Sequence, residues 1–312
     1  MSSSADVSLA YEVFRVVFIP WQRERRLAKE QERIRMARLL IAAGVFHSLA
    51  LRNDGNVACW GYNRSGQAPP DGVDGEFVAV AAGSLHSLAL RRDGNVACWG
   101  LNREGQAPPA GVEGDFVAIA AGGTHSLALR ADWSVACWGS NNYRQAPPDG
   151  VPGDFVAIAA GEFHSLALRR DGNVACWGGN HYLYDQTPPA GVEGDFVAIA
   201  AGVQHSLALQ RDGSIACWGN NEFGQAPPDG VQGDFVAIAA GANHSLALRR
   251  NGSVACWGDN YDGRAPPAGV EGDFVAIAAG NRHSLALRRD GSIVCWGDNQ
   301  YRQAPPEYSL LK

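Results

Sequence analysis

The stretch FVAVAAGSLHSLALRRDGNVACWG, residues 77–100, decides the fold, because nearly the same text occurs seven times between Ile41 and the C-terminus. Successive copies are 39 residues apart, except that 41 residues separate the fourth copy from the fifth. A fixed period of this length indicates one supersecondary unit repeated along an array. A residue found in every copy is then explained most simply by a role in holding its unit together.

Each copy predicts three strands. Residues 77–82 form an uninterrupted apolar run, which is typical of a strand covered on both faces. Residues 86–90 alternate large and small side chains, and residues 96–99 form a third short run. Asp93-Gly94 predicts a hairpin turn between the last two strands, because this dipeptide readily supplies positive φ. We therefore expect an antiparallel sheet of three strands per copy, with room for a short fourth.

A lone sheet of this size cannot bury both faces, so the copies must stack on one another. Radial stacking into a closed ring leaves only short, protected edges. The repeats therefore predict an all-β fold, a seven-bladed β-propeller of short antiparallel blades. An open solenoid is the alternative, but it needs atypical capping repeats, and only the first copy is atypical. We expect the tail, with Tyr308, Leu310 and Leu311, to close the ring against blade one.

The repeated phrases resemble the regulator-of-chromosome-condensation repeat family. They are Gly-x-x-His-Ser-Leu-Ala-Leu, Asp-Gly-x-Val-x-x-Trp-Gly-x-Asn and Gly-Gln. The first phrase and the Trp-Gly-x-Asn part of the second occur in all seven copies, whereas the other positions vary in some copies. The short period is most similar to the second-type β-lactamase inhibitor proteins, which have compact blades. The resemblance implies the propeller fold strongly. It implies function weakly, because the family includes nucleotide-exchange factors, a plant ultraviolet receptor, enzyme inhibitors and domains of ubiquitin ligases.

Two departures from the family narrow the functions that the resemblance implies. Exchange factors for Ran-type GTPases use loop elaborations on longer blades, whereas the one insertion here is two residues in copy four. The plant photoreceptor has tryptophan after the Gly of Gly-x-x-His in some blades. That position here holds Val45, Ser84, Gly123, Glu162, Val203, Ala242 and Asn281. Both departures argue against the corresponding activities.

Charge divides the chain into two predicted parts, an N-terminal arm over residues 1–37 and the propeller over residues 38–312. Residues 1–40 carry a net charge of +3 and residues 41–312 a net charge of −9. An acidic propeller disfavours direct binding to nucleic acid. Residues 21–40 are rich in helix formers and basic side chains, which predicts an α-helical arm. We favour a solvated helix leaning on the acidic ring over a segment that contacts a membrane.

The seven cysteines stand one per copy, each directly before the repeated tryptophan. An odd total at this spacing is typical of small buried side chains in a reducing compartment. No secretory signal is evident, and no run of apolar residues is long enough to span a bilayer. We expect a cytoplasmic or nuclear location.

The repeated polar and aromatic residues are predicted to be structural. Seven equivalent histidines around a ring lie too far apart for one tetrahedral metal site, so each is expected to cap its strand or bond a neighbouring blade's backbone. No nucleophile elbow or phosphate-binding glycine loop occurs. We therefore expect no catalytic, metal or cofactor residues, and not an enzyme. The structural set is His47, His86, His125, His164, His205, His244, His283, Trp60, Trp99, Trp138, Trp177, Trp218, Trp257 and Trp296.

Most differences between the copies fall in two loops, the Gly-x-x-His loop and the segment after Trp-Gly. Alternating strand directions place both loops on one face, with the Asp-Gly turns at the other end. Aromatic and arginine residues on rigidly held loops are typical anchors of protein interfaces. Neutral drift after duplication is the alternative. The predicted partner-binding residues are Phe46, Tyr62, Leu85, Arg103, Tyr143, Phe163, His181, Tyr182, Leu183, Tyr184, Phe223, Tyr261, Arg282 and Tyr301.

Two copies carry local exceptions. The loop of copy four is two residues longer and carries Tyr182, Leu183 and Tyr184, which we expect to be a hot spot. Copy three has Asp132-Trp133 where other copies have Asp-Gly or Asn-Gly. Because Trp tolerates positive φ badly, we expect that turn to be remodelled, with Trp133 folding back into a groove rather than standing as an exposed contact.

The sequence thus predicts a non-enzymatic scaffold that binds a protein partner through the variable loop face. The first alternative is a guanine-nucleotide exchange factor for a small GTPase. The second is a protein inhibitor that plugs an enzyme's active site. The sequence does not identify the partner.

Overall fold

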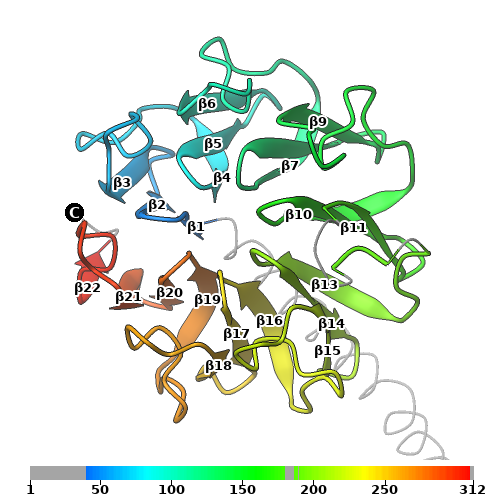
Figure 1. The fold of residues 1–312 in the computed structure, drawn as a ribbon. Coiled ribbons are helices and arrows are strands. Elements are labelled where there is room, and N and C mark those ends of the chain that lie inside the picture. The colour runs from blue at the N-terminus through cyan, green and yellow to red at the C-terminus, as the bar shows by residue number, and fades with distance from the viewer. Residues whose placement is uncertain (1–39, 180–185, 189, 310–312) are drawn as a thin grey trace, which may run out of the picture.

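The computed structural model describes residues 40–179, 186–188 and 190–309. Within these ranges, seven antiparallel sheets stand as blades around a central axis (Figure 1). Six sheets have three strands and the last has four. The predicted helical arm lies almost entirely outside the described residues. The described part of the chain holds no helix with the length and apolarity that crossing a membrane requires.

The strands follow one another around the ring in chain order. Blades one to three are β1 (Ile41–Ala43), β2 (His47–Leu51), β3 (Val57–Gly61), β4 (Phe77–Ala82), β5 (His86–Arg91), β6 (Val96–Gly100), β7 (Phe116–Ala121), β8 (His125–Arg130) and β9 (Val135–Gly139). Blades four and five are β10 (Phe155–Ala160), β11 (His164–Arg169), β12 (Val174–Gly178), β13 (Phe196–Ala201), β14 (His205–Gln210) and β15 (Ile215–Gly219). Blades six and seven are β16 (Phe235–Ala240), β17 (His244–Arg249), β18 (Val254–Gly258), β19 (Phe274–Ala279), β20 (His283–Arg288), β21 (Ser292–Gly297) and β22 (Glu307–Ser309).

The predicted three-strand unit is confirmed. In blade two, β5 pairs with β6 so that Leu88 faces Cys98, and β4 pairs with the other edge of β5. Gly94 closes the hairpin with a φ of 87°, as the Asp-Gly signal predicts. A Cβ at this position would lie 3.0 Å from the carbonyl oxygen of Gly114. The turn therefore favours glycine for both its backbone conformation and its close approach to the next segment.

The fourth strand is vestigial in six blades. There the third strand meets one valine of the segment after the Pro-Pro pair in an isolated bridge, as between Val57 and Val73. In blade seven the tail takes this place as β22, pairing Tyr308 with Ile293 of β21. The backbone of Tyr308 therefore pairs within its own blade and not with blade one, and packing of the tail against blade one stays a prediction. The tail lacks the glycine that turns the other Pro-Pro segments, so it continues as an extended strand along its own blade. Leu310 and Leu311 lie outside the described residues.

The hydrophobic core is divided into seven clusters, each shared by adjacent blades. Leu49 and Val57 of blade one pack with Phe77 of blade two, and equivalent residues repeat this contact around the ring. The seventh cluster joins the ends, because Ile41 of blade one packs with Leu285 and other residues of blade seven. The ring is therefore closed, which excludes the open solenoid.

A repeated polar joint also links each blade to the next. His47 Nε2 of blade one lies 2.9 Å from Ser87 Oγ of blade two, and Ser87 Oγ donates to the carbonyl of Gln67 at 2.9 Å. Trp99 Nε1 donates to the same carbonyl at 2.9 Å, and its ring is half-buried. The other six histidine–serine pairs are His86–Ser126, His125–Ser165, His164–Ser206, His205–Ser245, His244–Ser284 and His283–Ser48. Each histidine thus reaches the neighbouring blade as predicted, but it bonds a serine hydroxyl and not the backbone.

The joint fixes the protonation of these histidines. Ser87 has one hydroxyl hydrogen, which goes to Gln67, so His47 must donate from Nε2 and carry no proton on Nδ1. Burial lowers the pKa of His47 from 6.5 to about 3. The pKa of every other joint histidine is lowered to about 3 or 4, again mainly by burial. All seven are therefore neutral structural donors at neutral pH.

Candidate functional site

The two variable loops lie on one face of the ring. Tyr62 follows Trp-Gly and donates its N–H at 2.8 Å to the carbonyl of Phe46, which precedes the blade's histidine. The equivalent pairs in the other blades are Leu101–Leu85, Ser140–Thr124, Gly179–Phe163, Asn220–Gln204, Asp259–Asn243 and Asp298–Arg282. These bonds hold all seven loop pairs at the same end of their blades, and we call this end the loop face. The prediction that both loops share a face is confirmed.

The first aromatic cluster lies where blade seven meets blade one. The ring centroids of Tyr62 and Tyr301 are 5.0 Å apart, and Phe46 lies 5.3 Å from Tyr301 and 6.1 Å from Tyr62. All three pairs are edge-to-face, the arrangement that the quadrupoles of aromatic rings favour. We call these three residues the closure cluster. Residues more than 230 positions apart in the sequence thus form one surface.

A second cluster repeats part of this arrangement at the boundary of blades three and four. The rings of Tyr143 and Phe163 meet edge-to-face with centroids 5.1 Å apart. Tyr143 holds the same position in its copy as Tyr301, and Phe163 the same position as Phe46. We call this pair the Tyr143 cluster. Five of the predicted partner-binding residues are therefore brought together in two clusters.

Two arginines follow the tyrosines of these clusters in a backbone conformation that favours glycine. Arg144 has a φ of 62° and Arg302 a φ of 63°. Four other copies have glycine at this position, namely Gly66, Gly105, Gly224 and Gly263, with φ between 73° and 82°. A Cβ on any of these glycines would meet nothing within 4 Å. The position therefore has room for a side chain. A non-glycine residue there costs about 1–2 kcal/mol of stability, and this cost comes from the left-handed backbone conformation alone.

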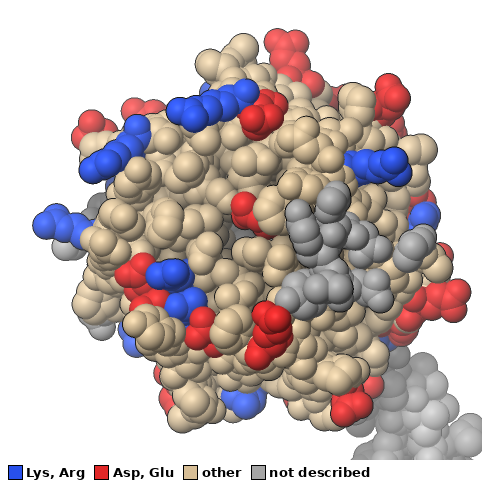
Figure 2. Space-filling view, in the orientation of Figure 1, with Lys and Arg blue, Asp and Glu red and all other residues tan. Residues whose placement is uncertain are grey.

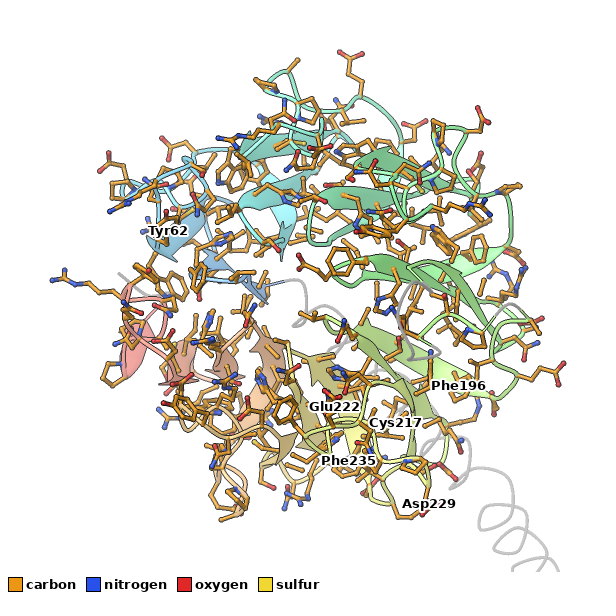
Figure 3. All side chains as sticks on the ribbon, viewed as in Figure 1. Tyr62, Phe196, Cys217, Glu222, Asp229 and Phe235 are labelled. Carbon is orange, nitrogen blue, oxygen red and sulfur yellow. The ribbon has the colours of Figure 1, made fainter. Side chains whose placement is uncertain are left out.

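The remaining predicted residues that the structure describes lie outside the two clusters. Leu85 is half-buried, whereas Arg103 and Arg282 are exposed. Phe223 is 52% and Tyr261 87% exposed, so both rings stand in solvent. Figure 3 labels Tyr62 and Glu222, which lie in the loops after Trp-Gly of blades one and five. The predicted hot spot, Tyr182, Leu183 and Tyr184, lies outside the described residues, as does His181.

The charges of the molecule are mixed. Figure 2 shows basic and acidic side chains interspersed around the ring rather than one field of a single sign. One arginine differs from the rest because Arg264 takes the place of the joint glutamine in blade six. Its side chain is 4% exposed, and its guanidinium pairs with Asp259 at 3.3 Å and with Asp262. This charge is structural, because two carboxylates already neutralise it.

The axis of the ring carries a cavity of about 100 Å³. It is lined by the Ala-Gly-x segment of every blade, at the loop between the first two strands. Most of its lining residues are therefore alanines and glycines. Glu162 and Ser84 are exceptions among the lining residues, and a hydrogen bond of 3.0 Å joins them. Sequence reasoning assigned no role to either residue.

Trp133 lies at the opposite end, which we call the turn face. It keeps a φ of 69° and donates its N–H to the carbonyl of Arg130 at 3.0 Å, as glycine does in the sibling turns. The prediction of a remodelled turn was therefore wrong. The ring is 40% exposed, and the guanidinium of Arg170 lies over it, 4.8 Å from the centroid. Trp133 thus packs on the arginine of the next blade instead of filling a groove.

The titratable groups of the repeats have fixed structural states. Burial raises the pKa of all seven cysteine thiols to about 12, so they are protonated and unreactive at neutral pH. No disulfide links them. Among the residues that the structure describes, no group of three or more His, Cys, Asp or Glu side chains is placed to hold a metal ion.

Comparison with known proteins identifies the repeats. The profile of the "Regulator of chromosome condensation (RCC1) repeat" matches residues 40–67, 77–106, 116–145, 155–182, 196–225, 235–264 and 274–303. These segments make up more than half of the chain and place one repeat in every blade. No curated protein sequence matches the chain.

Solved structures share the fold. The CRINKLY WD40 ectodomain of the Arabidopsis thaliana receptor kinase ACR4 superposes with a TM-score of 0.67 at 23% identity, covering 85% of this chain and 98% of that one. The receptor kinase CR4 ectodomain of Physcomitrella patens gives 0.67 at 24% identity, with 83% and 73% covered. Prp20p from Saccharomyces cerevisiae gives 0.64 at 23% identity, with 79% and 81% covered.

At these identities the structural likeness supports the fold alone. The repeat profile matches the sequence of this chain in every blade, over the segments that form the strands and the joints. This match is evidence for the family as well as for the fold. The chain therefore belongs to the Regulator of chromosome condensation (RCC1) repeat family.

Proposed function

We propose that this protein is a non-enzymatic scaffold that binds a partner protein through the loop face. The observation that carries the proposal is the pair of matching sites at Tyr143-Arg144 and Tyr301-Arg302. Each combines an aromatic cluster that bridges two blades with an arginine held at positive φ. Tyr and Arg are among the side chains enriched at the energetic anchors of protein interfaces.

Backbone strain supports a functional role over neutral drift. An arginine in the left-handed region costs about 1–2 kcal/mol relative to glycine, and strain of this kind concentrates at binding sites. The strained arginine, the preceding tyrosine and the phenylalanine on the next blade occur together in two copies of seven. Independent drift at three positions would not be expected to select the same combination twice.

The scaffold supports binding in another way. The loops are held by backbone hydrogen bonds and by the joints between blades, so the clusters are preorganised on a closed ring. A preorganised surface loses little conformational entropy when it binds. Mixed charges on an acidic ring favour a protein partner over nucleic acid.

Two narrower functions remain candidates within this proposal. Prp20p is described with its binding properties to Gsp1p and histones, and an exchange factor for a small GTPase is the first of them. An inhibitor that inserts a loop into an enzyme's active site is the second. A nucleotide-release assay with purified small GTPases and an inhibition screen against hydrolases distinguish these from a plain scaffold. We further propose that residues 38–312 form the binding unit, in the cytoplasm or nucleus, beside a separate arm of residues 1–37.

The test is quantitative affinity capture with three versions of the full chain. One is the natural sequence, and one combines Tyr143→Ala, Phe163→Ala and Arg144→Gly on the loop face. The control carries Trp133→Gly on the turn face. We expect the control to capture the same partner as the natural sequence and the loop-face variant to lose at least tenfold, measured by mass spectrometry and by titration of the purified pair. Equal capture by all three would overturn the proposal.

A further inference from the structure

The axial cavity at the loop face holds a carboxylate that reaches across a whole blade. Glu162 belongs to blade four, and its Oε2 accepts a hydrogen bond of 3.0 Å from Ser84 Oγ of blade two. The blade between them contributes Gly123 at the same position of the repeat. The glutamate therefore lies over blade three at the mouth of the axial cavity.

Three neighbouring copies depart from the repeat in complementary ways to make this arrangement. Copy four alone has glutamate at this position, copy three alone has glycine and copy two alone has serine. A Cβ on Gly123 would lie 2.6 Å from Glu162 Cδ, so glycine is what gives the carboxyl group its space. Ser84 then supplies a hydroxyl donor on the far side. Coordinated change at three positions indicates a built feature rather than a variable loop residue.

Among the residues that the structure describes, none places a positive charge beside this carboxylate. The lining residues of the cavity are alanines, glycines, Val45, Val203, Asn281, Ser84 and Glu162, with no Lys, Arg or His among them. Burial raises the pKa of Glu162, and the hydrogen bond from Ser84 offsets only part of this effect. A partly buried carboxylate of this kind is stabilised by a cation that enters its site.

We infer that the axial mouth binds a primary ammonium group, which pairs with Glu162 while its alkyl stem packs on the alanine wall. An ammonium is a compact charge on a flexible apolar stem, whereas a guanidinium is a broad planar fork that requires two parallel acceptors. Oε2 of Glu162 already accepts the hydrogen bond from Ser84, so its two oxygens are not equally available to a bidentate fork, and this favours the single N–H of an ammonium. Because the mouth opens on the loop face, a lysine side chain of the partner is the natural source, and this identification of the source rests on the proposed function.

The test uses a free amine, so that its outcome does not depend on finding the partner. The full chain, carrying ¹³C-labelled glutamate, is titrated with n-butylammonium chloride, and the carboxyl resonance of Glu162 is assigned by its loss in Glu162→Gln. Tetramethylammonium chloride at equal ionic strength is the matched control, because it has the charge without N–H donors. Butylguanidinium chloride tests the choice between the two cation classes.

We expect butylammonium to lower the pKa of Glu162 saturably, by about one unit, with a dissociation constant in the millimolar range. Tetramethylammonium and butylguanidinium should leave the pKa within error. An absence of saturable shift, or an equal shift with tetramethylammonium, would overturn the ammonium site, and an equal shift with butylguanidinium would overturn its selectivity. Each failure leaves the capture result on the aromatic clusters intact, and a failed capture leaves this titration intact.

Discussion

His283 Nε2 lies 2.8 Å from Ser48 Oγ, although 235 positions of sequence separate the two residues. The equivalent joint between blades one and two, His47 with Ser87, measures 2.9 Å. Ser48 also donates to the carbonyl of Gln303, as Ser87 does to Gln67. The joint that closes the ring is therefore the same as the joints within the chain.

The seven joint histidines predict steep acid unfolding. Each is neutral in the folded state, with a pKa lowered from 6.5 to about 3 or 4. Between those values the unfolded chain binds more protons than the folded ring, so stability falls as pH drops below 6.5. The loss approaches roughly 1.4 kcal/mol per pH unit for each histidine. Urea unfolding followed by circular dichroism should show the midpoint falling sharply from pH 7 to pH 5. An unchanged midpoint over that range would contradict neutral, buried histidines.

Removing the closure hydroxyl should destabilise the ring. Ser48→Ala leaves the Nε2–H of His283 buried without an acceptor, which costs about 1–3 kcal/mol. Ser126→Ala, at the joint between blades two and three, is the matched variant and should cost a similar amount in the global free energy of unfolding. Hydrogen exchange should distinguish them, because only Ser48→Ala loosens a boundary that no peptide bond crosses. We expect faster exchange in β1 and β20 for Ser48→Ala, and a uniform pattern for both variants would argue against the closure joint.

Arg144 and Arg302 should lower the free energy of unfolding and strengthen binding to the partner. Arg302→Gly restores the residue that four other copies have and should raise the free energy of unfolding by about 1 kcal/mol. Gly224→Arg is the reverse change at an equally open position and should lower it by a similar amount. Chemical denaturation of the two variants measures both effects. A stabilised Arg302→Gly that still binds the partner at full strength would remove Arg302 from the proposed interface.

Trp133 allows strain and side-chain contact to be separated. Trp133→Ala loses the stacking on Arg170 and keeps the backbone strain of a non-glycine residue at positive φ. Trp133→Gly loses the same contact but relieves the backbone. We expect the glycine variant to be more stable than the alanine variant by about 1 kcal/mol. Thermal melting of the pair gives the difference, and equal melting temperatures would show that the turn carries no strain.

Repetition made the fold predictable from the sequence. The period set the number of blades, and alternation with Asp-Gly turns set the strands to within one or two residues, as β4, β5 and β6 show. The partners of the joints were not predictable, because His47 and Ser87 meet only once two blades are packed side by side. The turn at Trp133 was mispredicted because a local cost of about 1–2 kcal/mol is small beside the hairpin and bridge contacts that hold the turn.

The candidate site was predicted as a face but not as a set of contacts. Strand directions alone placed Tyr143 and Phe163 at the same end of the ring. Their ring contact depends on the distance between adjacent blades, which sequence spacing does not give. Arg144 and Arg302 were absent from the predicted site, although their replacement of glycine before the joint glutamine was a readable signal. The contact of Glu162 could be recognised only in the closed ring, because its partner Ser84 lies two blades away.

All seven histidine–serine joints are alike, so the contact between two neighbouring blades does not depend on which blade comes first in the chain. Opening the chain at any Pro-Pro segment and joining residue 309 to residue 40 by a flexible linker would leave the same set of boundaries. The molecule should therefore tolerate circular permutation, with the aromatic clusters and the axial carboxylate unchanged in position. New termini could then be placed on the turn face, away from the surface that carries the variable side chains.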